Sequence, residues 1–153
     1  SQINVEFSLD QEGKPFYKVI HKGQTVIGNY YMGFDLKDSP SLSSNFEVLS
    51  TNKSAFNETW PMPWGEQLEV ENNYNELKIN LEEKSGLKRK ISITYRVFND
   101  GIGFKYDFPE QENLKEVIIL DENTEFALTG DHMAYWAPGD WDIYEHLYGT
   151  SGF

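Results

Sequence analysis

The chain has 153 residues and carries 25 Asp and Glu against 13 Lys and Arg, which gives a formal charge of −12 at neutral pH. This charge excludes two classes of partner, nucleic acids and anionic membrane surfaces, because both attract clustered Lys and Arg. The 39% of apolar residues, with 15% aromatics, are ample for the core of one folded domain.

Cysteine is absent from the sequence, which excludes disulfides, thiolate metal sites and a cysteine nucleophile. No apolar run reaches the roughly 20 residues that span a bilayer. Residues 1–5 alternate like a strand and do not resemble a signal peptide. We therefore expect a chain without membrane insertion, from which any export signal has already been removed.

In the first third, apolar residues recur at every second position, the pattern of half-buried strands. Residues 3–9 alternate, residues 10–15 have turn chemistry and residues 16–20 are again apolar, which predicts a first hairpin. Further strands are expected at residues 25–27, 33–36 and 46–51, with a polar loop at residues 37–44.

The strongest local pattern lies in the middle of the chain, where apolar residues alternate at 77–81, 91–97 and 104–108. Asn99, Asp100 and Gly101 favour the positive φ angles of a tight hairpin turn. The pattern predicts three consecutive antiparallel strands, with Ile91, Ile93, Tyr95 and Val97 facing one core.

Residues 117–120 form a continuous apolar run, which predicts a strand buried on both faces. From residue 130 onward the alternation fades, and residues 151–153 suggest no closing element. Many short strands without an amphipathic helix favour an all-β fold, an antiparallel β-sandwich or a barrel.

Two segments that we expect to be loops, residues 58–66 and 132–148, contain all four tryptophans together with acidic residues. Aromatic rings stack on the flat faces of sugars, and carboxylates accept hydrogen bonds from sugar hydroxyls, so both segments suit carbohydrate binding. The alternative is that these aromatic residues close the end of a β-sandwich as part of its core.

The spacing of acidic residues and histidines along the chain does not indicate a catalytic site or a metal site. Glu58 with Glu66, or Asp140 and Asp142 with Glu145, are candidate carboxylate pairs for glycoside hydrolysis, but an acidic chain offers many solvated carboxylates, so none is assigned. The residues after Asp121 do not complete a calcium loop, because its sixth position lacks glycine and its twelfth lacks glutamate. The three histidines have no paired spacing for zinc.

Five segments together resemble the N-terminal domain of glycoside hydrolase family 97, the bacterial α-glucosidases and α-galactosidases. They follow the order of the family and cover most of the chain: residues 10–17, 58–66, 73–77, 95–106 and 124–136.

The resemblance implies a galactose-mutarotase-like supersandwich, here truncated, which packs in the whole enzyme on a (β/α)8 catalytic barrel. It also implies a periplasmic or exported enzyme with a calcium ion near its catalytic carboxylates, although no calcium or catalytic residue is carried over to this chain. We expect residues 1–153 to be inactive alone and without a cofactor, and we expect either a dimer through the truncated end or poor order of residues 132–153. The residues expected to face substrate or barrel are Trp60, Trp64, Glu66, His132, Trp136 and Trp141.

Two other roles remain open at this point. In a free-standing carbohydrate-binding module, the tryptophans form an exposed planar row. In a purely structural domain, they are all buried. Partial exposure on one broad apolar surface favours the domain of a larger enzyme.

Overall fold

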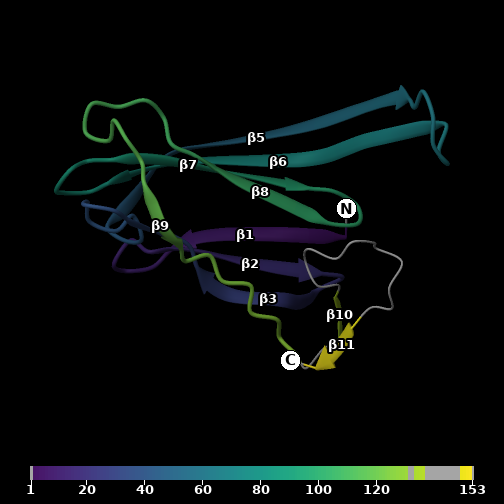
Figure 1. Cartoon of the computed structure of the whole chain (residues 1–153), viewed down its shortest axis with the longest axis horizontal. Helices are drawn as coiled ribbons and strands as arrows, with labels where there is room; N and C mark the ends of the chain where they lie inside the picture. The colour runs from purple at the N-terminus through teal and green to yellow at the C-terminus, as the bar shows by residue number, and fades with distance from the viewer. Residues whose placement is uncertain (1, 131–132, 137–148, 153) are drawn as a thin grey trace.

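The computed structural model describes residues 2–130, 133–136 and 149–152, and the regular structure of these residues is β-strand (Figure 1). Within these ranges no helix is long and apolar enough to cross a membrane. The expectation of an all-β, antiparallel fold is confirmed, since every pairing between the described strands is antiparallel.

The strands in chain order are β1 (Ile3–Leu9), β2 (Pro15–His21), β3 (Gln24–Tyr31), β4 (Phe34–Leu36), β5 (Phe46–Pro61), β6 (Glu69–Glu83), β7 (Lys90–Val97), β8 (Ile102–Asp107), β9 (Ile119–Glu122), β10 (Met133–Trp136) and β11 (Gly149–Gly152).

Two sheets face each other across the core. One has the order β1-β2-β3 and the other the order β5-β6-β7-β8, while β4 pairs with β9 and β10 pairs with β11. In Figure 1 the four-stranded sheet lies above the three-stranded sheet, and the paired ends of β5 and β6 extend beyond both. Each of the two sheets follows chain order, which is the simplest antiparallel connection.

The predicted first hairpin is confirmed by the full-length pairing of β1 with β2. Its turn is held by Asp10, whose Oδ1 accepts hydrogen bonds from the backbone N–H groups of Glu12 and Lys14, both at 2.9 Å. Gly13 has a φ angle of 74°, and a Cβ there would lie 2.6 Å from the backbone N and O of Phe46. This turn therefore requires glycine both for its conformation and for its contact with the start of β5.

The predicted strands in the middle of the chain are also confirmed, because β7 pairs with β6 on one side and β8 on the other. Ile91, Ile93 and Tyr95 are buried and face the core, as expected, whereas Val97, the fourth residue of the pattern, is half-buried and is not among the buried core residues. Ser92 and Thr94 on the opposite face are also buried, with 8% and 4% of their surface exposed. Strand alternation therefore predicted the facing of β7 correctly but not the burial of its polar side chains.

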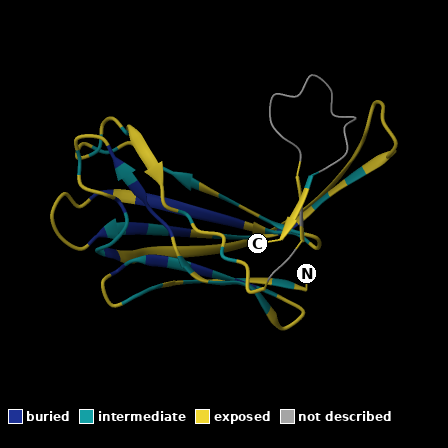
Figure 2. Ribbon diagram, turned by 60° about the horizontal axis from the view of Figure 1, so that its bottom comes forward, coloured by how far each residue is buried: buried dark blue, intermediate teal, exposed yellow. Residues whose placement is uncertain are grey.

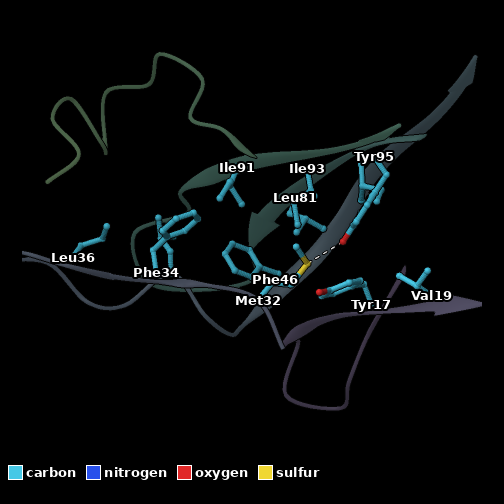
Figure 3. Close-up of a cluster of buried hydrophobic side chains, with 12 residues drawn as sticks. Tyr17, Val19, Met32, Phe34, Leu36, Phe46, Leu81, Ile91, Ile93 and Tyr95 are labelled. Atoms are coloured by element: carbon cyan, nitrogen blue, oxygen red, sulfur yellow. Dashed lines mark hydrogen bonds between the residues drawn. The ribbon is translucent and has the colours of Figure 1, made fainter. Parts of the chain in front are cut away.

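The core consists of apolar and aromatic side chains from both sheets and from the segment between them (Figure 3). Tyr95 donates a hydrogen bond from its hydroxyl to the Sδ of Met32 at 2.9 Å, and Tyr17 donates one to the carbonyl of Glu125 at 2.7 Å. Burial raises the pKa of both tyrosines above its ordinary value, so these hydroxyls stay protonated donors. The buried members of the core are Tyr17, Val19, Met32, Phe34, Leu36, Leu42, Phe46, Ile79, Leu81, Ile91, Ile93 and Tyr95.

The loop of residues 37–44 is anchored by Arg89, which is 1% exposed. Its guanidinium donates to the carboxylate of Glu83 at 2.6 and 2.8 Å, and it also donates to the Ser39 hydroxyl and to the carbonyls of Pro40 and Ser41. Burial alone would raise the pKa of Glu83, but the hydrogen bonds and the charge of Arg89 outweigh that effect and lower it. The sequence does not reveal this pair, because the spacing of charged residues does not show which of them are buried.

Candidate functional site

The segment of Trp60 and Trp64 forms the end of a long hairpin. β5 and β6 pair from Phe46 opposite Glu83 to Pro61 opposite Glu69, and the backbone N–H of Met62 donates to the carbonyl of Leu68 at 2.9 Å. The sequence predicted a strand at residues 46–51 and a loop at residues 58–66. This expectation was wrong in extent, because the pairing with β6 carries β5 through Trp60 to Pro61.

This hairpin end, residues 56–74, projects beyond the sandwich (Figure 2). The partner strand β7 pairs with β6 only as far as Asn75, so the hairpin end is a two-stranded ribbon. Its two tryptophan side chains are exposed, Trp60 at 38% and Trp64 at 82%. Glu66 lies beside them in the loop and is also exposed.

A second apolar surface follows β8. The run at residues 117–120 was expected to be buried on both faces, and this was wrong, because Ile118, Ile119 and Leu120 are 44%, 46% and 66% exposed. The physical reason is that β9 pairs with the short strand β4 alone, which leaves its other edge and much of its surface uncovered.

Farther along the chain, exposed apolar residues recur at Phe126 and Leu128 and in β10. There Tyr135 is 74% and Trp136 is 50% exposed. A Cβ on Gly149 of β11 would lie 2.7 Å from the ring of Trp136, so glycine at that position lets the ring lie against the strand. The sequence suggested no closing element after residue 150, whereas β11 pairs with β10 there.

The candidate site residues therefore lie on two elements. Trp60, Trp64 and Glu66 belong to the β5–β6 hairpin and Trp136 belongs to β10, whereas His132 and Trp141 lie outside the described residues. Figures 1 and 2 show the hairpin end and the β10–β11 pair toward the same end of the long axis. The purely structural alternative, in which all tryptophans are buried, is wrong for the three described tryptophans.

Acidic and histidine side chains in the described ranges form no group of three or more that could hold a metal ion. The calcium ion that the resemblance implies for a whole enzyme stays an expectation and is assigned to no residue of the described ranges. Glu58 lies on β5 and Glu66 in the loop beyond it, and the pair carries no catalytic assignment. Asp140, Asp142 and Glu145 lie outside the described residues.

Comparison with known proteins gives one family and several similar structures. The model of the glycosyl-hydrolase 97 N-terminal family matches residues 1–153. A glycoside hydrolase family 97 enzyme from Pseudoalteromonas sp. strain K8, solved with panose, is 31% identical with a TM-score of 0.87, and the match covers 98% of this chain and 23% of that chain. A family 97 enzyme from the same strain, solved with acarbose, gives the same identity, TM-score and coverage.

A β-arabinopyranosidase matches at 20% identity with a TM-score of 0.74, covering 88% of this chain and 21% of that chain, which shows similarity of fold. In each of these structures the matched domain is less than a quarter of the chain.

The fold and the exposed surface define the class of protein: an antiparallel β-sandwich domain of a kind that its relatives carry within a longer polypeptide. This chain belongs to the glycosyl-hydrolase 97 N-terminal family, as the resemblance in its five segments indicated.

Proposed function

We propose that this domain is the non-catalytic N-terminal part of an α-glycosidase, which packs on a (β/α)8 barrel and frames the active site of that barrel. The whole enzyme would hydrolyse α-glucosides or α-galactosides. The observation that carries the proposal is the tryptophan-bearing hairpin end, which projects from the sandwich with Trp64 82% exposed in a chain of this family.

The projecting ribbon is energetically unfavourable when it is surrounded by water. A two-stranded ribbon is marginally stable in water, and exposed tryptophan and leucine side chains add unfavourable contact with solvent. Packing against a neighbouring domain removes both penalties. Exposed apolar side chains on β9 and on β10 support the same conclusion, because exposed apolar surface commonly marks interfaces.

The experiment is a Trp64→Ala substitution made both in the whole enzyme and in the 153-residue chain. In the isolated chain we expect the free energy of unfolding to change by less than about 0.5 kcal/mol, because the side chain is 82% exposed. In the whole enzyme we expect a lower kcat/KM on an aryl α-glucoside and a lower Tm, since the side chain would there be part of an interface.

The matched control is Leu87→Ala, which removes a 46% exposed apolar side chain from the turn at the opposite end of β6. It should leave kcat/KM and Tm of the whole enzyme unchanged. Equal effects of Trp64→Ala and Leu87→Ala on the kcat/KM and Tm of the whole enzyme would contradict the proposal. Maltoheptaose binding by the isolated chain that is lost in Trp64→Ala would instead favour the free-standing carbohydrate-binding module.

A further inference from the structure

A row of aromatic side chains crosses the outer face of the four-stranded sheet, the face turned away from the core. Phe56 on β5 stacks on Tyr74 of β6 with ring centroids 5.3 Å apart, and Tyr74 contacts Phe98 after β7 at 5.4 Å. The guanidinium of Arg96 lies over the Tyr74 ring at 4.4 Å. Tyr74 is thereby 9% exposed, while Phe56 remains 41% exposed.

Two hollows adjoin this row, and Phe98 lines both of them. The larger has a volume of about 390 Å³ and is lined by Thr94, Arg96, Phe98, Gly103, Phe104 and Lys105. The smaller has a volume of about 250 Å³ and is lined by Glu71, Asn73, Phe98, Asn99 and Asp100.

Glycine at position 103 helps to form the larger hollow. Gly103 lies opposite Arg96 in the β7–β8 pairing, and a Cβ there would meet no atom within 4 Å. The backbone at this position does not have a positive φ angle, so the conformation itself does not demand glycine. A larger side chain would therefore fill the hollow without straining the strand.

The charges around the hollows identify the chemistry of a ligand. Arg96 is paired with Glu76 at 2.8 Å, and Lys105 is paired with Asp107 at 2.9 Å. An anionic ligand would meet these carboxylates, and a cationic ligand would meet the two basic groups. The hydroxyls of a neutral ligand can donate hydrogen bonds to the carboxylates and accept them from the basic groups, and they can also bond to the amides of Asn73 and Asn99.

We propose that the two hollows and Phe98 form a binding site for a neutral oligosaccharide on the outer face of the sheet. One pyranose ring stacks on Phe98, and its hydroxyls bond to the polar side chains of the two hollows. The site includes Glu71 and Asn73 of β6 but none of the tryptophans of the hairpin end, and it can be tested in the chain without the proposed barrel.

The experiment compares Gly103→Val with Gly101→Val in the 153-residue chain, using calorimetric titration with maltoheptaose. Gly101 is the matched control, because a Cβ there also meets nothing within 4 Å but the residue lines a different depression. We expect Gly103→Val to abolish binding and Gly101→Val to retain it. Phe98→Ala should weaken binding by about fivefold, the size of a lost ring contact.

Amide shift mapping by NMR provides a second measurement that does not depend on a variant's folding. Maltoheptaose should perturb residues 94–105 together with Glu71 and Asn73, and it should leave the tip of the hairpin, residues 60–68, unchanged. Shifts confined to that tip, no binding of maltoheptaose, or equal binding by both glycine variants would overturn the proposal. Binding of trigalacturonate in preference to maltoheptaose would overturn the assignment of a neutral ligand.

Discussion

Arg89 and Glu83 form a buried ion pair that ties the loop of residues 37–44 to the four-stranded sheet. The side chains are 1% and 8% exposed, and their closest N–O distance is 2.6 Å. Removing one partner of such a pair leaves the other charge buried without its counterion, which lowers the free energy of unfolding strongly. Replacing both partners by apolar residues changes the free energy of unfolding far less.

Arg89→Met is accordingly expected to lower the free energy of unfolding by about 3–5 kcal/mol. The matched control is Lys90→Met, which breaks the neighbouring exposed pair with Glu82 at 3.6 Å and should cost less than about 1 kcal/mol. Urea unfolding followed by circular dichroism measures both. Equal losses in the two variants would show that Arg89 has no special role in anchoring the loop.

The same pair predicts how stability depends on pH. The pKa of Glu83 is lower in the folded chain than its ordinary value of about 4.5. Its ionised form therefore stabilises the fold fully above that value, and this contribution is lost as the pH falls through the folded pKa. We expect the stability difference between the unmodified chain and Glu83→Gln to be constant near neutral pH and to shrink in acid.

Urea unfolding of both chains over a series of pH values down to the acid limit of folding tests this expectation. Asp35 must be considered in the interpretation, because hydrogen bonds from Ser41 and Asn123 lower its pKa as well. The Glu83→Gln comparison cancels that contribution, since both chains retain Asp35. A difference that widens in acid would contradict the assigned direction of the shift.

At the scale of elements, the β5–β6 hairpin consists of two parts with different support. Residues 75–82 of β6 pair with β5 on one side and β7 on the other, whereas residues 69–74 pair with β5 alone. The length of the hairpin follows from continuous pairing, but its projecting end has no third strand and little buried surface.

We expect amide hydrogens of residues 69–74 to exchange at least about tenfold faster than those of residues 75–82, since local opening requires less free energy where fewer contacts are broken. Hydrogen exchange read by NMR measures this in the isolated chain. The whole enzyme provides the comparison, because packing on the proposed barrel should remove the difference. Equal protection of both halves in the isolated chain would show that the ribbon is stable by itself.

At the scale of the whole molecule, exposed apolar surface and a net charge of −12 act in opposite directions. The surface on β9 and β10 favours association, and like charges on two copies oppose it. Salt screens the repulsion between like charges, whereas the apolar contact stays favourable. Ionic strength should therefore decide which effect dominates.

The isolated chain is therefore expected to form more dimer as the salt concentration rises from about 0.05 M to about 0.5 M, measured by light scattering. Tyr135→Glu, at a position 74% exposed on β10, should keep the chain monomeric over the same range. A chain that stays monomeric at high salt and high concentration would contradict a dimer through this region.

The sequence alone was sufficient to predict the strands that have one face toward the core. The alternation of Ile91, Ile93 and Tyr95 predicted both their strand and their burial, because period two places successive side chains on opposite faces. The position of the turn at residues 99–101 and the family were likewise evident from the sequence, although none of these three turn residues has the positive φ angle that was expected. These features depend on neighbours in sequence, which the sequence displays directly.

The tertiary structure decided what depends on distant parts of the chain. The run at residues 117–120 has the composition of a buried strand, yet it is exposed, because β9 finds a partner in β4 alone. Strand β5 continues to Pro61 because β6 pairs with it throughout, and Arg89 is buried because Glu83 and the loop carbonyls surround it. Burial is set by which segments come together in space, and apolar composition specifies a preference for burial without specifying the partner that provides it.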